Sequence, residues 1–307
     1  MPTAPALLKG DERCPDPYPE GVPFEVDADE LIRLRPLDPE AAGSVRVQLT
    51  LFRPLPFVRD PGLEQVVLAA IGDDTERFAV LVKELEHGRG AAVDIGRSFY
   101  AASLFKPWVM LEAFSQRDAG LLDFGERYIV SDYYGEFGLN PGELEVCDEV
   151  TVGEAMERMM ALTDNVAANL LLDRVGAGNV NSALRRLGLS DSGFPGDDSL
   201  PTTAADTALL LEAIVAGGAV SEAASDEMLA LLEAESINDR LPALLPKGTR
   251  VAHKTGNWED ATHDAGIIVS PGATYVIVVL TDFGFQDGGA ARIARLSRMV
   301  YDYYNEG

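Results

Sequence analysis

The sequence predicts an α+β fold in which an antiparallel sheet, built from both ends of the chain, is flanked by helices and interrupted by an inserted all-helical lobe. Two β-rich stretches, 77–85 and 91–95, precede a long helical block. Three further β-rich runs follow that block, at 250–254, 264–269 and 275–280. Because strands lie on both sides of the helices in the sequence, we expect them to meet in one sheet, with a cleft between the two lobes.

The N-terminal part, residues 1–61, is rich in Pro, Asp and Glu, and we expect it to be an extension packed on the main body. Its alternating run at 44–52 is typical of a strand. The remaining domain, 62–307, is divided into a sheet lobe (62–112 and 245–307) and a helical lobe (113–244). A helix is predicted over 61–71, and a glycine-containing turn at 87–90 predicts a hairpin between the first two strands.

Several helices are predicted within the helical block. Thr151 followed by Glu154 is a capping box, which marks a helix start. The inner side of that helix is predicted to carry Ala155, Met156, Met159, Met160 and Leu162, and the methionines are interpreted as core residues. Further helices are expected at 166–175, 180–187, 203–216 and 222–234, with a closing helix at 288–304.

Ser103 and Lys106 stand three residues apart at the start of a predicted helix that runs to about Ser115. Backbone N–H groups and the helix dipole at this end would stabilise an alkoxide or an oxyanion. Lys106 lies on the same helix face, within reach of the Ser103 hydroxyl. A lysine acts as a base when burial or a second cation lowers its pKa. Ser103 is therefore a candidate nucleophile, with a helix N-cap as the alternative.

Two more motifs accompany this pair, namely Thr163-Asp164-Asn165 after the first helix of the block and Lys254-Thr255-Gly256 in a C-terminal strand. The chain has only five lysines, and Lys106 and Lys254 are the two that lie within motifs, so Lys254 is the candidate second cation. The ordered combination of S-x-x-K, S-D-N and K-T-G is the signature of class A β-lactamases and penicillin-binding proteins.

With these motifs, the stretch from about Leu63 to Tyr304 resembles that family of serine hydrolases, which implies a β-lactamase/transpeptidase-like fold. The resemblance implies that Ser103 is acylated, that Lys106 removes its proton and that Thr163 passes a proton to the leaving nitrogen. Lys254 would tune the hydroxyls of Ser103 and Thr163. The residues implied in substrate binding are Asn165 for an amide side chain, Lys254 and Thr255 in the Lys254-Thr255-Gly256 motif for a carboxylate, and the backbone N–H groups of Ser103 and Asn257 for the oxyanion.

The sequence departs from the family pattern in two places. Thr163 stands where the family usually has serine, so the hydroxyl is kept and a methyl is added. The segment 187–198 corresponds to the loop that carries a deacylating glutamate in class A β-lactamases, but it holds no glutamate. Its carboxylates, Asp191, Asp197 and Asp198, are interpreted as turn residues. Such a site would trap β-lactams as a penicillin-binding protein does.

The implied function is a β-lactamase-like serine hydrolase that forms an acyl-enzyme on Ser103 with β-lactams or related amides and esters, and deacylates slowly. The alternatives are an esterase or D-Ala-D-Ala peptidase of the same fold, or a binding module without catalysis. His253, and His263 with Asp264, could be drawn as a triad with Ser103. We interpret them instead as strand residues flanking a turn.

Composition limits the partners of the chain. A net charge of −25 argues against nucleic acid and anionic membranes, so a small molecule or peptide is expected: a β-lactam, a peptidoglycan-like peptide or an ester. No apolar run is long enough for a transmembrane segment, and no signal peptide is visible. The resemblance implies an extracytoplasmic location, with a cytoplasmic one left open. Cys14 and Cys147 could form a disulfide or remain thiols, and we expect no metal or other cofactor.

Overall fold

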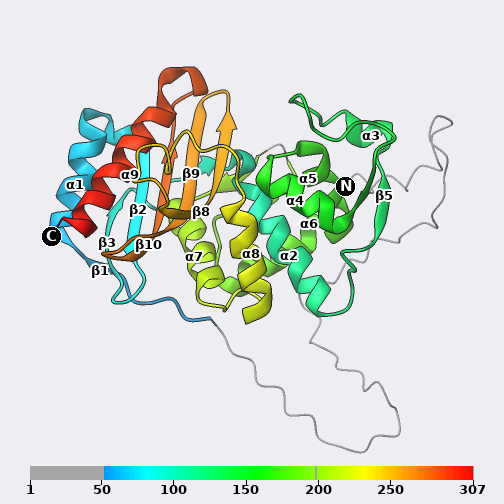
Figure 1. The fold of residues 1–307 in the computed structure, drawn as a ribbon, viewed down its shortest axis with the longest axis horizontal. Coiled ribbons are helices and arrows are strands. Elements are labelled where there is room, and N and C mark those ends of the chain that lie inside the picture. Colours follow the sequence, from blue (N-terminus) through cyan, green and yellow to red (C-terminus); the bar gives the residue numbers. More distant parts are fainter. Residues whose placement is uncertain (1–51, 198, 307) are drawn as a thin grey trace, which may run out of the picture.

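The computed structural model describes residues 52–197 and 199–306. Its centre is a six-stranded sheet with the order β1-β3-β2-β10-β9-β8 (Figure 1). The strands are β1 (Val58–Arg59), β2 (Phe78–Glu84), β3 (Arg89–Val93), β8 (Arg250–Trp258), β9 (Ala261–Val269) and β10 (Thr274–Thr281). Neighbours are antiparallel except β1 and β3, and β2 pairs with β10 along its whole length. This pairing joins the two ends of the chain and confirms the predicted sheet.

The two faces of the sheet are covered by different helices (Figure 1). Helices α1 (Pro61–Ile71) and α9 (Gly289–Asn305) pack together on one face, and α7 (Ala204–Val215) packs on the other. The apolar strand β10 serves both cores, because successive side chains of a strand point to opposite faces. Val276, Val278 and Leu280 belong to one buried cluster, whereas Tyr275, Ile277 and Val279 belong to the other.

The middle of the chain forms the helical region beside the sheet (Figure 1). Its helices are α2 (Lys106–Asp118), α3 (Asp132–Gly135), α4 (Val152–Ala161), α5 (Asn165–Val175), α6 (Ala177–Leu187) and α8 (Glu222–Glu233). Short 3-10 helices complete the fold at η1 (Gly72–Arg77), η2 (Ala102–Phe105) and η3 (Phe285–Asp287). Among the described residues, no helix has the length and apolar character needed to cross a membrane.

Two small sheets in this region were not predicted. β4 (Phe99–Tyr100) pairs with β7 (Pro201–Thr202), and β5 (Arg127–Ile129) pairs with β6 (Glu149–Thr151). Strands of two or three residues are too short to show a period in the sequence. The exact division into a sheet lobe and a helical lobe stays a prediction.

The α4 helix shows where residue-level predictions were right and wrong. Its capping box between Thr151 and Glu154 is present, and the three methionines are buried. Leu162 was expected to face the core but is 52% exposed, because it is the C-cap residue beyond the last turn of the helix. All of the strand-like run at 44–52 except Phe52, and also Cys14, lie outside the described residues, so that strand stays a prediction. For Cys14 and Cys147, a disulfide and free thiols stay the two alternatives.

Candidate active site

Ser103 lies in η2, between strand β4 and helix α2. The sequence predicted an α-helix from this residue, but the regular helix begins at Lys106 and Ser103 occupies a tighter turn before it. Ala102 has a φ of 47°, which is uncommon for a residue with a side chain and indicates that the turn is held by its surroundings. Ser103 is half-buried, caps neither helix and makes no side-chain hydrogen bond to any described residue. The N-cap alternative is therefore wrong.

Lys106 is fully buried directly behind that turn. Its Nζ donates to the backbone oxygen of Thr163 at 2.6 Å and to Asn165 Oδ1 at 2.9 Å. Burial and the positive charge of Lys254 lower the pKa of Lys106 to about 7, although three nearby carboxylates oppose this shift. Both physical routes named from the sequence, burial and a second cation, therefore act on this amine.

Lys254 on β8 is the second buried cation of the site. Its Nζ donates to Thr163 Oγ1 and pairs with Glu235, which follows α8 and is also buried. Burial lowers the pKa of Lys254 even though Glu235 opposes the shift. The same carboxylate oxygen accepts from the hydroxyl of Thr255 at 3.3 Å. Sequence reasoning missed Glu235, since a lone acid in a loop has no motif, but a lysine that is buried as an ammonium requires a counter-ion.

The turn between α4 and α5 brings the second motif to the two lysines. Thr163 has a φ of 60°, a strained value for a β-branched residue, and it directs its carbonyl to Lys106 and its hydroxyl to Lys254. Asp164 is fully buried and caps α5 by accepting from the N–H of Ala167 at 2.9 Å. Asp164 therefore fixes the turn, and Thr163 and Asn165 face the site.

Gly256 places the third motif against the serine turn. A Cβ at Gly256 would lie 3.1 Å from the backbone oxygen of Ala101 and 3.4 Å from Leu104 Cγ, so the close approach favours glycine. Arg240, fully buried, donates to the oxygen of Gly256 at 3.2 Å and to Asn257 Oδ1 at 2.7 Å. Sequence reasoning gave Arg240 no role.

The two histidines of this region are held inside the sheet, as predicted. His253 Nδ1 pairs with Asp264 Oδ1 at 2.9 Å. His263 donates through Nε2 to the backbone oxygen of Tyr100 at 2.9 Å and accepts from the N–H of Thr281 at 3.1 Å. Burial lowers the pKa of His263 to about 4, so the ring is neutral. The hydrogen bond from His263 to Tyr100 holds strand β4, which leads to Ser103. Neither histidine forms a triad with Ser103 in the described residues.

Comparison with known proteins identifies the family of the chain. A sequence-family model described as the β-lactamase enzyme family matches residues 62–304. The chain belongs to this family. Among curated proteins, a β-lactamase of Bacteroides uniformis is 25% identical over 177 residues. That match covers 50% of this chain and 60% of the Bacteroides protein, so the chain spans about six-tenths of this relative.

Solved structures of the β-lactamase fold cover a larger share of this chain than the Bacteroides protein does. PBP-A superposes with a TM-score of 0.76 at 25% identity, covering 83% of this chain and 100% of PBP-A. A mutant of PBP-A, solved as an acyl-enzyme complex with penicillin G, has a TM-score of 0.75. A β-lactamase from Sphaerobacter thermophilus has a TM-score of 0.72 at 25% identity, covering 80% of this chain and 98% of that protein.

The loop after α6 packs an aromatic ring, Phe194, against the helix that follows Ser103. The side chain of Asn181 holds the backbone N–H and oxygen of Phe194, both at 2.8 Å. The ring lies 5.8 Å from that of Phe105 and 5.7 Å from that of Trp108. Asp197 accepts from the N–H of Ser199 at 2.9 Å, as expected of a turn residue. Asp191 is exposed, and Asp198 lies outside the described residues.

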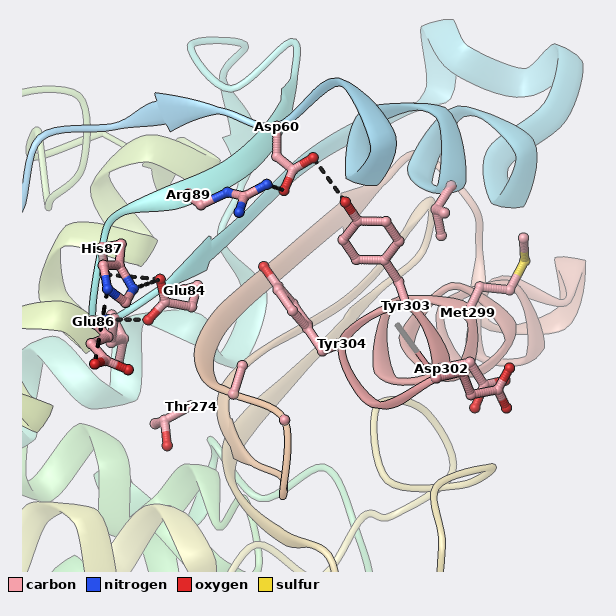
Figure 2. Close-up of a pocket in the computed structure, with 15 residues that line it drawn as sticks. Asp60, Glu84, Glu86, His87, Arg89, Thr274, Met299, Asp302, Tyr303 and Tyr304 are labelled. Carbon is pink, nitrogen blue, oxygen red and sulfur yellow. Dashed lines mark hydrogen bonds and ion pairs between the residues drawn. The ribbon is translucent and has the colours of Figure 1, made fainter.

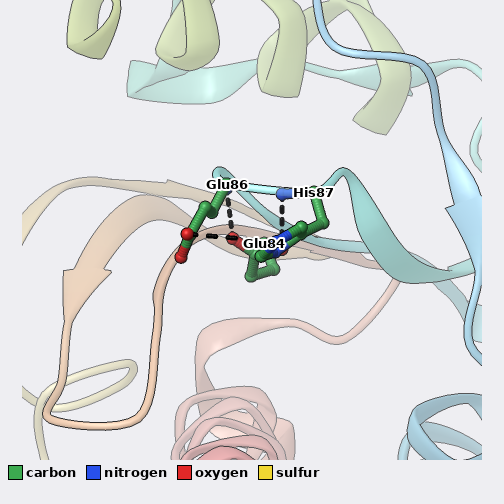
Figure 3. Close-up of side chains that lie close together, drawn as sticks. All are labelled: Glu84, Glu86 and His87. Carbon is green, nitrogen blue, oxygen red and sulfur yellow. Dashed lines mark hydrogen bonds and ion pairs between the residues drawn. The ribbon is translucent and has the colours of Figure 1, made fainter.

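A cavity of about 980 Å³ lies between the β2–β3 hairpin and the end of α9 (Figure 2). None of the residues that line it belongs to the three motifs. At its edge, ligand atoms of Glu84, Glu86 and His87 lie within 4.8 Å of one another, close enough to hold a cation (Figure 3). However, Glu84 accepts from the backbone N–H groups of Glu86 and His87, whose side chains are exposed. We therefore infer that this cluster stabilises the hairpin turn between β2 and β3.

Proposed function

We propose that this chain is a serine hydrolase that forms an acyl-enzyme on Ser103 with β-lactams or related amides and esters. The observation that carries the proposal is the Lys106 amine, buried one helical turn from Ser103 with a pKa of about 7. Its two hydrogen-bond partners among the described residues are both oxygen acceptors and neither is a carboxylate. A neutral amine is therefore available at neutral pH, as a general base requires.

In the acylation step, Lys106 removes the Ser103 proton and the serine oxygen attacks the carbonyl carbon. Lys106 bonds Thr163 and Asn165 in the structure, and the contact between a nucleophile and its base often tightens only in the complex with substrate. The resulting oxyanion accepts from the N–H groups of Ser103 and Asn257. Each donor of this kind contributes roughly 3 to 4 kcal/mol to the transition state.

Collapse of this intermediate breaks the carbon–nitrogen bond, and the leaving nitrogen takes a proton from the Thr163 hydroxyl. Lys254 donates to Thr163 Oγ1, so the hydroxyl hydrogen remains available to another acceptor. Lys254 then replaces the proton that Thr163 gives up. The contact between these two groups supports the assigned role of threonine in place of serine.

The remaining motif residues bind the substrate. Lys254 and Thr255 take its carboxylate, and Asn165 takes its amide side chain. Gly256 lets the β8 strand approach the serine turn, which brings the Asn257 N–H to the oxyanion. We propose small molecules or peptides as substrates, no nucleic acid partner because of the charge of −25, and an extracytoplasmic location by analogy with the family.

Slow deacylation is the second part of the proposal. The loop at 187–198 contains no glutamate, and its Phe194 packs against the rings of Phe105 and Trp108. The similarity to PBP-A, of which a mutant is an acyl-enzyme complex with penicillin G, supports an adduct that persists. The alternatives are a D-Ala-D-Ala peptidase or an esterase of the same fold.

Intact-mass spectrometry over time with benzylpenicillin and with a thioester depsipeptide tests the proposal. We expect a long-lived mass increase equal to the penicillin, absent in Ser103→Ala. Complete turnover without an adduct would instead indicate a β-lactamase with another base, and depsipeptide turnover that exceeds penicillin reactivity would select the peptidase or esterase. If neither compound reacts at Ser103, the chain is a binding module.

A further inference from the structure

Glu143 belongs to none of the three motifs, yet its carboxylate reaches the second of them. It lies between α3 and β6 and is 9% exposed. Asn165 Nδ2 donates to Glu143 Oε1 at 2.9 Å, and Asn140 Nδ2 donates to the same oxygen at 2.8 Å. The N–H of Leu139 donates to Oε2 at 2.8 Å. Three donors thus surround this carboxylate and hold it in place.

The segment around Glu143 is fastened to the turn that carries Thr163 and Asn165. After Glu143, the N–H of Leu144 donates to Asp164 Oδ2 at 3.0 Å. Before it, the oxygen of Gly142 accepts from Arg158 at 2.6 Å, and Arg158 Nε also binds Asp164 at 2.9 Å. The position of Glu143 is therefore set by bonds on both sides.

The amide of Asn165 is oriented by its two neighbours. Its Oδ1 accepts from Lys106 Nζ at 2.9 Å and its Nδ2 donates to Glu143 at 2.9 Å. Lys106 Nζ donates to Oδ1 and the Glu143 carboxylate only accepts, so an amide turned over would lose its bond to Glu143 and place its oxygen against the carboxylate. Nδ2 has a second hydrogen, which makes no bond to any described residue and remains available to a substrate carbonyl.

We propose that Glu143 is a positioning residue that holds Asn165 ready for the acylamino group of a β-lactam and, through Asn165, holds the Lys106 amine. The inference rests on the proposed function, in which Asn165 binds the substrate amide. It specifies the substrate class: β-lactams that carry an acylamino side chain depend on Glu143, whereas those with a free amine at that position do not.

Glu143 also contributes charge to the site. Four charged groups act on Lys106: Lys254 from β8, Glu143, Asp164 at the start of α5 and Glu235 after α8. Lys254 lowers the pKa of Lys106, and the three carboxylates raise it. Removing the charge of Glu143 therefore lowers the pKa of Lys106 further. The rise of acylation rate with pH should then occur at lower pH.

The experiment compares Glu143→Gln and Glu143→Asp with wild type, and Glu145→Gln serves as a matched control because Glu145 is an exposed acid of the same segment. Second-order acylation constants are measured by intact mass with benzylpenicillin, which has an acylamino group, and with 6-aminopenicillanic acid, which has a free amine. The series runs from about pH 5 to about pH 9, so that it brackets the acid limb, which is the pH range where the rate rises as Lys106 loses its proton.

Glutamine has one acceptor oxygen where Glu143 has two, so either the Leu139 N–H or the Nδ2 groups of Asn140 and Asn165 lose their acceptor, and the hold on Asn165 weakens. Above the acid limb, we expect the acylation constant for benzylpenicillin to fall about tenfold and that for 6-aminopenicillanic acid to change less than about twofold. The acid limb should move to lower pH. Glu143→Asp keeps the charge but is one methylene shorter, so the preference for benzylpenicillin should fall while the acid limb stays. Glu145→Gln should change neither quantity.

Melting temperatures are measured to check that each variant is folded. If Glu143→Gln does not fold, Glu143→Asp alone serves for the substrate test. An unchanged ratio of the two penicillins in Glu143→Asp would overturn the inference and leave the proposed function standing. If wild type itself reacts with neither penicillin, the proposed function fails, and this inference fails with it.

Discussion

Lys254 and Glu235 form an ion pair that is buried on both sides, and the ammonium of this pair also donates to the Thr163 hydroxyl. Glu235 further accepts from the hydroxyl of Thr255, so one carboxylate anchors two residues of the third motif. A buried charge left without its partner is costly, because the low dielectric strengthens both the attraction and the penalty. This pair therefore links the stability of the chain to its chemistry.

Replacing Glu235 with alanine should destabilise the protein strongly. The change leaves the Lys254 ammonium buried without a counter-ion, and breaking such a pair costs about 3 to 5 kcal/mol. We expect the free energy of unfolding in urea to fall by that order. Glu233→Ala is the control, since the Glu233–Arg250 pair is exposed and its loss should cost less than about 1 kcal/mol. Equal losses in the two variants would contradict a special role for Glu235.

Acylation by benzylpenicillin should rise with pH through about 7, the pKa of Lys106. Below this pH the amine is protonated and cannot accept the Ser103 proton. Because the charge of Lys254 lowers the pKa of Lys106, Lys254→Ala should move the rise to higher pH in addition to slowing the reaction. The measurement is the second-order acylation constant against pH. A rise at the same pH in both proteins would show that another group controls the profile.

The same pKa predicts how stability depends on pH. Between about pH 7 and the ordinary pKa of 10.5, the unfolded chain binds a proton at Lys106 that the folded chain lacks, so the free energy of unfolding rises with pH in this range. Lys106→Met removes this contribution. The difference in unfolding free energy between wild type and Lys106→Met should therefore shift in favour of wild type from pH 7 towards pH 10. A constant difference would contradict the lowered pKa.

The sequence predicted the parts of the fold and site that have a local pattern. The three motifs could be recognised by their resemblance to a family signature. The capping box at Thr151 and the apolar strand β10 could be recognised because their patterns reflect helix and strand geometry. Glu143, Glu235 and Arg240 had no such signal, since each is a single charged residue in a loop whose role depends on tertiary contacts.

Arg240 should be needed for efficient acylation although it is not assigned contact with substrate. It binds the oxygen of Gly256 and the side chain of Asn257, so it holds the strand end whose N–H is proposed to meet the oxyanion. Arg240→Ala should lower the acylation constant for benzylpenicillin by roughly 10- to 100-fold, comparable to a misplaced oxyanion donor. Arg250→Ala is the control, because that side chain is 68% exposed. Equal acylation constants in the two variants would show that Arg240 has no part in positioning the oxyanion donor.

Substitution of Thr163 separates its hydroxyl from its methyl group. Thr163→Ser keeps the oxygen that bonds Lys254 and relieves a β-branched residue held at a φ of 60°, so acylation should stay within about threefold of wild type. Thr163→Val keeps the branched shape but removes the hydroxyl, and loss of a proton-transfer group costs about 100-fold or more. Both variants are compared by acylation rate and by melting temperature. If Thr163→Val acylates as fast as Thr163→Ser while remaining folded, the leaving nitrogen takes its proton from another group, and Lys106 and Lys254 are the next candidates because their Nζ atoms already contact this residue.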